Sequence, residues 1–491
     1  MNSLATRVVE GANPILVKEV RAALRGRWFK VTFSIVLALA VVVSLGFLAF
    51  TFGEDGSPSG DAFFRAVYLC AGLGVNMLVP FAAMLSMNAE SDENTLELLQ
   101  LSGISGWRVV AGKLASAMIQ AVLVLSAFLP FLAFAFLLRG VDAASIAVAV
   151  VYSLAACATQ SSLGILLGTL ARARWARVVW MLLFGLFLLQ SSQVGVLFAL
   201  GAFFAPGFIG GGTGLGTGLA VGLLVLASLA VTFVSFAAAR LAHVEENRST
   251  PVRVTTTVLV IVGVVLARLS GGTDPAVAIL CTTTFLIAVP LWLVVSEREP
   301  LPRAVAADLP RWARRFPFLA PWLPGGGLGA VYVVLHLSLI VGAMLWPHAG
   351  SVSATHASDV GTVLVLALTF VVYLLLVPGV MSFVRGPVSQ PAIVRGAVVA
   401  FVVVLNLTPV LASALLATPE LATTAPLAMP FALRGTTMPP PLPSLVLLSL
   451  VAIAVLVNVP RVLAGFRGVA TARARARTRE EGGAERAATG I

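Results

Sequence analysis

Residues that do chemistry are scarce in this chain of 491 residues, and they do not follow the spacing of common enzyme motifs. The Gly-Lys pair in Gly112-Lys113-Leu114 lacks the Ser or Thr that completes a phosphate-binding loop. No His-Glu-x-x-His sequence is present, and the three cysteines lie in apolar runs without the spacing of metal ligands. The sequence therefore predicts that the chain is not an enzyme and holds no cofactor or metal of its own.

The composition indicates a membrane protein. Apolar residues make up 59% of the sequence, charged residues 11%, and the mean hydropathy is +1.00. Roughly a quarter of the residues of a soluble domain are charged, so this chain has too few charges to cover a water-exposed surface. Disorder, a collagen-like fold and a disulfide scaffold are excluded as well. We expect an all-α polytopic membrane protein, whose net charge of +11 reflects cytoplasmic loops facing anionic lipids rather than a nucleic-acid partner.

The elements that must position any site are transmembrane helices, each of which needs roughly 20 apolar residues. About twelve segments qualify, of which the seventh is the shortest. They are residues 31–52, 66–87, 114–138, 144–170, 178–200, 219–239, 254–268, 275–295, 328–346, 360–383, 397–416 and 442–460. Apart from Arg268, the last residue of 254–268, none of these twelve segments contains Asp, Glu, Lys or Arg.

The basic residues predict the orientation of the helices. With the N-terminus inside, 28 of the 32 Lys and Arg residues fall on the inner side and four on the outer side. Such an excess is typical of cytoplasmic loops, so both termini are expected in the cytoplasm. Because nearly all basic residues are arginine and alanine is abundant, the composition favours a bacterial protein of the cytoplasmic (inner) membrane.

Two segments have the pattern of interfacial helices. After the helix start at Asn13-Pro14, apolar residues recur on one face and basic residues on another, as in a helix lying on the inner leaflet. A shorter segment at 309–316 repeats this pattern with three arginines. The residues expected to hold the first helix at the interface are Lys18, Arg21, Arg25 and Trp28.

Neutral polar residues within the expected spans allow two interpretations. The cluster Gln190, Ser191, Ser192 and Gln193 can form hydrogen bonds between helices or line a polar pathway. His336 follows Tyr332 by four residues, which allows a hydrogen bond within one helix or a step in a proton relay. The Gly164-x-x-x-Gly168 pattern favours close packing of two helices.

The loop between the second and third spans has the pattern of a short helix. Asn94 can cap its start, Glu97 is placed three residues later as in a capping box, and Gly103 suits its end. At roughly two turns this helix is too short to span, so it is expected at the membrane face with an acidic N-terminal end. A plain connector is the alternative.

This loop resembles the motif of type-2 ABC transporter permeases, Glu-x-Glu-x-Gly-Thr-Leu-Glu-Leu-Leu followed by Gly-Lys-Leu at the third span. Asn94 replaces the usual Gly, and Ser102-Gly103 replaces a Thr-Pro turn. Asn13 to Glu19 also resembles the opening of such permeases. The resemblance implies a connecting helix at the N-terminus and a coupling helix that contacts an ATPase. The residues assigned to the coupling helix are Glu90, Asp92, Asn94, Thr95, Leu96, Glu97, Leu98 and Leu99.

The resemblance covers roughly residues 10–245 and implies how the chain works. Residues 1–245 are expected to form a six-span permease-like domain, residues 250–462 a six-span extension without a second copy of the motif, and residues 463–491 a basic cytoplasmic tail. The partners implied are an ABC ATPase that binds ATP and Mg, a second permease subunit, identical or different, and membrane lipids. The expected function is export driven by that ATPase. An ion-coupled secondary transporter and a non-transporting membrane scaffold are the alternatives.

Overall fold

The computed structural model describes most of the chain in twelve stretches. They are residues 14–53, 60–92, 105–138, 141–170, 177–191, 214–242, 247–269, 273–297, 301–345, 354–383, 391–415 and 441–489. The chain divides into two compact units, Met1–Ala242 and His243–Ile491. The roles that the sequence suggests for the two halves stay a prediction.

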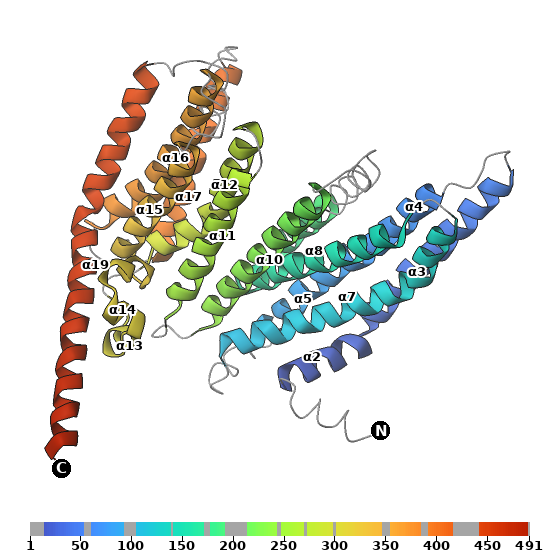
Figure 1. Ribbon diagram of the computed structural model, residues 1–491, viewed down its shortest axis with the longest axis horizontal. Helices are drawn as coiled ribbons and strands as arrows, with labels where there is room; N and C mark the ends of the chain where they lie inside the picture. The colour runs from blue at the N-terminus through green and yellow to red at the C-terminus, as the bar shows by residue number, and fades with distance from the viewer. Residues whose placement is uncertain are drawn as a thin grey trace. The chain divides into compact units, whose positions relative to one another are not determined.

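The first unit is a bundle of helices (Figure 1). Within it α8 packs against α5 and α10, α7 packs against α4 and α8, and α2 lies on α7. Its elements are α2 (Pro14–Arg25), α3 (Arg27–Gly53), α4 (Gly60–Gly72), η1 (Leu73–Leu78), α5 (Val79–Asp92), α7 (Gly106–Leu137), α8 (Ala143–Leu170), a helix at Arg177–Ser191, and α10 (Gly214–Leu241).

The second unit is also helical. Its long C-terminal helix packs against α15 and α16, and α12 packs against α11, α15 and α16. Its elements are α11 (Ser249–Leu269), α12 (Thr273–Val295), α13 (Arg303–Ala307), α14 (Arg311–Arg315), the 3-10 helix η2 (Pro317–Trp322), α15 (Gly326–Leu345), α16 (Ala354–Met381), α17 (Pro391–Leu415) and α19 (Pro441–Thr489).

The described helices are those of a multi-pass membrane protein. Ten of them are long and apolar enough to cross a bilayer, and shorter apolar helices lie at Arg177–Ser191 and Ile393–Leu407. Each of the twelve expected ranges falls on one of these helices over its described part. Large apolar side chains such as Val42, Leu186 and Leu456 are 64–67% exposed, as expected for residues that face lipid.

Several helices extend beyond the apolar stretch that predicts them, so charged residues next to the expected spans lie on the same helices. Helix α5 continues to Asp92, so Glu90 lies on the helix rather than in the loop. Helix α7 begins at Gly106 and includes Lys113, and α11 begins at Ser249 and includes Arg253. The reason is that backbone hydrogen bonding continues past the hydrocarbon, where hydropathy no longer marks the helix.

A π-helical segment, η1, joins α4 to α5. Its wider turn is marked by the N–H of Val79, which donates to the carbonyl of Gly74 five residues earlier. Pro80 follows at once, and proline neither donates a backbone hydrogen bond nor tolerates the carbonyl four residues before it. The local widening of the helix accommodates this clash.

The expected close approach at Gly164 and Gly168 is confirmed, since a Cβ atom at either position would lie 2.8 Å from an atom of α5.

Two segments of the second unit that the sequence predicts to be cytoplasmic differ in structure from the expectation. Residues 309–316 do not form one amphipathic helix, because Leu309 precedes the five-residue α14 and is 1% exposed. The expected solvated tail instead begins as a continuation of α19, in which Val469 and Ala472 are buried in the same cluster as Leu309 and Ala313. Arg473 also donates to the backbone carbonyl of Ala313. The apolar residues Val469 and Ala472 therefore hold the start of the tail against the segment of α13 and α14, although the tail is rich in arginine.

Candidate functional site

A buried ion cluster joins three helices of the first unit. The ammonium group of Lys113 on α7 lies 3.2 Å from Glu19 Oε1 on α2 and 3.1 Å from Glu90 Oε1 on α5. The side chain of Lys113 is 1% exposed, and those of Glu19 and Glu90 are 13% and 10% exposed. A buried charge is tolerated only when it is paired, so each of these residues depends on the others.

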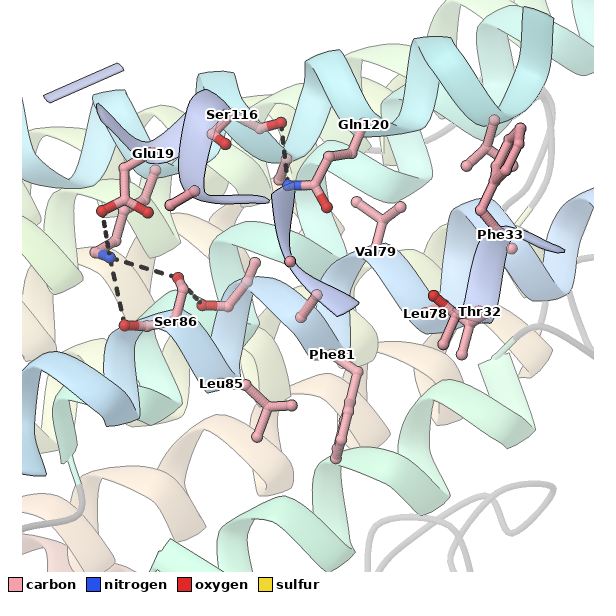
Figure 2. Close-up of a pocket in the computed structure, with 18 of the residues that line it drawn as sticks. Glu19, Thr32, Phe33, Leu78, Val79, Phe81, Leu85, Ser86, Ser116 and Gln120 are labelled. Atoms are coloured by element: carbon pink, nitrogen blue, oxygen red, sulfur yellow. Dashed lines mark hydrogen bonds and ion pairs between the residues drawn. The ribbon is translucent and has the colours of Figure 1, made fainter. Parts of the chain in front are cut away.

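Ser86 completes the surroundings of the ammonium group. Its backbone carbonyl and its hydroxyl oxygen each lie 3.4 Å from Lys113 Nζ. An ammonium group has three N–H donors, and these are directed to Glu19, Glu90 and Ser86. Figure 2 shows Glu19 and Ser86 at the same end of an adjoining cavity. Lys113 therefore has no donor left for a further ligand, whereas carboxylate oxygens can each accept more than one hydrogen bond.

The cavity beside this cluster has a volume of about 560 Å³. This is within the range of roughly 300–1,000 Å³ that encloses small ligands. Apolar side chains of α3, η1, α5 and α7 form most of its wall, and the polar residues Ser116 and Gln120 interrupt it on α7. The amide nitrogen of Gln120 donates to the carbonyl of Ser116, and Gln120 points into the space in Figure 2.

The cavity has a polar end and an apolar end. Lys113 and Val124 both line it and are eleven residues apart on α7, a rise of about 16 Å. Glu19 and Ser86 lie near Lys113, whereas Leu78 and Phe33 lie at the other end (Figure 2). The arrangement suits a molecule with one polar end and one apolar end.

The structure places the residues expected on the interfacial and coupling helices as follows. Lys18, Arg21 and Arg25 on α2 are exposed. The side chain of Trp28 and residues Asn94, Thr95, Leu96, Glu97, Leu98 and Leu99 lie outside the described residues, as does the side chain of Asp92, the last residue of α5. Glu90 is the coupling-helix residue whose side chain the structure describes, and it belongs to the ion cluster.

Gln190 and Ser191, the described residues of the polar cluster at 190–193, are not among the residues that line the cavity. The amide of Gln160 on α8 donates to the hydroxyl of Ser191 over 3.1 Å, which is a hydrogen bond between helices. Gln190 is exposed, and Ser192 and Gln193 lie outside the described residues.

A second buried ion pair, which sequence reasoning missed, lies in the second unit. Arg253 is fully buried and donates to Ser249 Oγ over 2.8 Å, to the carbonyl of Pro321 over 2.6 Å and to Glu297 Oε2 over 2.7 Å. Glu297 Oε2 also accepts the backbone N–H of Gly325 over 2.9 Å. Arg253 stands one residue before the expected seventh span. An arginine directly beside an apolar run was the sequence feature that could have indicated a buried ion pair.

The expected bond between Tyr332 and His336 forms through the backbone. His336 Nδ1 lies 2.7 Å from the carbonyl oxygen of Tyr332, and Nε2 lies 2.9 Å from the hydroxyl of Thr257. The Tyr332 hydroxyl donates instead to the carbonyl of Arg253. Trp322 also donates to Thr257, so this group fastens α11 to α15 and η2.

Comparisons with known protein families, with curated proteins and with solved structures found no match to this chain. Among the described residues no group of three or more His, Cys, Asp or Glu side chains is placed to hold a metal ion.

Proposed function

We propose that the chain is the membrane subunit of a bacterial ABC exporter of the type-2 class, driven by a separate ATPase that binds ATP and Mg. The observation that supports this proposal is the meeting of Glu19, Glu90 and Lys113. Each belongs to a different sequence motif of the resemblance: the N-terminal opening, the acidic start of the loop, and the Gly-Lys-Leu that opens the third span. Residues far apart in the sequence thus meet where the proposed coupling would act.

The ion cluster offers a mechanical route for coupling. Residues 93–104 connect α5 to α7, and Glu90 and Lys113 tie the two helices together on either side of this segment. Glu19 adds α2, which continues through Gly26 into α3. A push by an ATPase on the segment 93–104 would therefore reach α5, α7 and α2 together, because a paired buried charge resists separation.

The proposal includes a topology and partners. Twelve spans with both termini in the cytoplasm follow from the distribution of arginine and lysine. The first unit is the permease-like part, and it pairs with a second permease subunit. Residues 250–462 are an extension, and the interfacial helix α2 rests on lipid headgroups through Lys18, Arg21 and Arg25.

The test is ATP hydrolysis by the full chain, co-expressed with a candidate phosphate-loop ATPase and reconstituted in liposomes. We expect co-purification of the two chains and hydrolysis above that of the ATPase alone. The double variant Leu98→Asp/Leu99→Asp is expected to abolish both, because it places charges in the proposed apolar contact. Glu97→Lys is expected to abolish stimulation, since it reverses the charge at the start of the helix.

A matched control is Phe318→Asp, which changes an aromatic residue of the second unit that is 69% exposed. It is expected to leave association and hydrolysis unchanged. Normal stimulation in both the Leu98→Asp/Leu99→Asp and the Glu97→Lys variants would contradict the coupling assignment. Substrate flux that follows an ion gradient without ATP would favour a secondary transporter instead.

A further inference from the structure

The cavity of the first unit has features that define a ligand class. Its wall is mostly apolar, and its charged side chains, Glu19 and Lys113, stand together at one end. The distance of about 16 Å along α7 corresponds to half of the roughly 30 Å hydrocarbon core of a bilayer. Exposed basic residues of α2, Lys18 and Arg21, are close in sequence to the charged end and suit the depth of the lipid headgroups. The cavity therefore has the depth of one leaflet.

The charged end favours a hydrogen-bond donor over an anion. Lys113 directs its N–H groups to Glu19, Glu90 and Ser86, so it has none left for a phosphate or a sulfate. Glu19 accepts from Lys113 through Oε1, and its other oxygen, Oε2, has no hydrogen-bond partner among the described residues. In Figure 2 the second oxygen of Glu19 points away from the bonded one. Two ionised carboxylates and one ammonium group give these three side chains a formal charge of −1, and the charge of Lys18 on α2 also acts on Glu90.

We propose that this cavity binds an amphiphile with a protonated amine head, which donates to Glu19 Oε2, and a single apolar chain that extends along α7 toward Leu78 and Val124. A protonated amine neutralises the net charge of the cluster, whereas an anionic head is repelled by the carboxylates in a region of low dielectric. Gln120 and Ser116 lie between the two ends and divide the polar end from the apolar end. The proposal concerns binding by this chain alone and does not depend on an ATPase.

The ligand chemistry has two sources. One is a resident bilayer lipid with a primary ammonium head, such as phosphatidylethanolamine, whose one chain occupies the cavity. The other is a single-chain amine that enters from the inner leaflet. Both present the same ammonium group and apolar chain, so competition experiments distinguish them.

The test uses the full chain purified in a maltoside detergent and three photoreactive probes. Each probe has the same sixteen-carbon chain with a diazirine, and the heads are a primary amine, a hydroxyl and a sulfate. We expect the amine probe to label peptides of α3, α5 and α7 at least tenfold more than the sulfate probe, with the alcohol between them. Equal labelling by the three probes, or labelling spread evenly over the chain, would overturn the proposal.

Two variants assign the label to the cavity. Ala82→Trp on α5 fills the cavity from its wall and is expected to remove most of the labelling. Ala89→Trp is the matched control, because Ala89 is also exposed on α5 but does not line the cavity. Glu19→Gln is expected to lower labelling by the amine probe to the level of the alcohol probe while leaving the alcohol probe unchanged. Full amine labelling in both Ala82→Trp and Glu19→Gln would exclude the site.

Competition then separates the two sources. Loss of amine-probe labelling with excess phosphatidylethanolamine would identify a resident lipid. Loss with excess dodecylamine but not with the lipid would identify a single-chain amphiphile. Competition by neither compound would overturn the proposal, because a site of this chemistry must bind one of them. Since no nucleotide or ATPase is present, failure here leaves the proposed coupling to be judged by its own hydrolysis assay.

Discussion

Lys113 on α7 and Glu90 on α5 lie 3.1 Å apart in the interior of the first unit, on either side of the segment that connects their helices. A pair of this kind fixes the spacing of two helix ends more firmly than apolar contact does, because separating the charges leaves both unpaired in a region of low dielectric. Glu19 adds a third helix to the same group. The ion cluster therefore forms a rigid junction that joins α2, α5 and α7.

Removal of Lys113 is expected to destabilise the first unit strongly. In Lys113→Met the carboxylates of Glu19 and Glu90 stay buried without a cation, a change that costs about 3–5 kcal/mol when one partner of a buried pair is lost. The thermal unfolding midpoint of the purified full chain in detergent measures this loss. Lys30→Met is the control, because Lys30 is exposed and its loss is expected to change stability by no more than about 0.5 kcal/mol.

The same junction allows a compensating experiment. The triple variant Glu19→Gln/Glu90→Gln/Lys113→Met removes all three charges and is expected to regain most of the stability that Lys113→Met alone loses. If Lys113→Met unfolds at the same temperature as the unaltered chain, the buried ion cluster is absent from the protein in detergent.

The close packing of α8 on α5 predicts opposite effects at two glycines. A Cβ atom at Gly164 would lie 2.8 Å from the backbone carbonyl oxygen of Pro80, whereas at Gly46 nothing lies within 4 Å. Gly164→Ala is therefore expected to cost about 1–3 kcal/mol through overpacking. Gly46→Ala is expected to be neutral or to stabilise α3 by up to about 1 kcal/mol, because alanine restricts the unfolded chain. Thermal unfolding of the two variants checks the contrast, and equal midpoints would contradict it.

The apolar runs of the sequence were sufficient to predict the helices but not their ends. Each run of roughly 20 apolar residues marks a helix, because the hydrocarbon requires an internally hydrogen-bonded backbone. Hydropathy measures the lipid-facing part alone, so the extension of α5 to Asp92 and the start of α11 at Ser249 were missed. Hydropathy also failed to predict the packing of Val469 and Ala472, because the arginines around them make the segment hydrophilic on average.

The residues of the ion cluster were each visible in the sequence, but their meeting was not. Glu90 and Lys113 belong to the motif of the loop between the second and third spans, and Glu19 belongs to the N-terminal segment that resembles the opening of such permeases. Their contact depends on how α2 lies on α7, a tertiary relationship that no local spacing contains. The cavity could not be predicted either, because it is the space left between helices whose facing residues are known only after packing.

The topology predicts the side of the membrane at which three introduced cysteines react. Glu54→Cys is expected to react with a membrane-impermeant maleimide in intact cells, and Glu246→Cys and Glu480→Cys only after lysis. The native cysteines Cys70, Cys157 and Cys281 are buried, so background labelling is expected to be low. Labelling of Glu480→Cys in intact cells would require an odd number of spans.

The buried Arg253 of the second unit predicts that arginine and lysine are not interchangeable there. Its planar guanidinium group donates to Ser249, Pro321 and Glu297 in three directions, and to the carbonyl of Gly325 over 3.1 Å. The ammonium group of a lysine cannot reproduce this fork, so acceptors are left unpaired in Arg253→Lys. We expect a loss of about 1–3 kcal/mol for this variant, the cost of an unsatisfied buried polar group.

Arg253→Met removes every donor and is expected to cost more than Arg253→Lys, about 3–5 kcal/mol, because the Glu297 carboxylate then lacks its cation. Adding Glu297→Gln to Arg253→Met should recover part of this loss, since the amide keeps an acceptor for the backbone N–H of Gly325 without a charge. Arg311→Lys on α14 is the control, because Arg311 is exposed and its change is expected to leave the unfolding midpoint within about 0.5 kcal/mol of the unaltered chain. Thermal unfolding in detergent compares these four variants with Glu297→Gln alone, and strictly additive effects of Arg253→Met and Glu297→Gln would show that the two side chains do not interact.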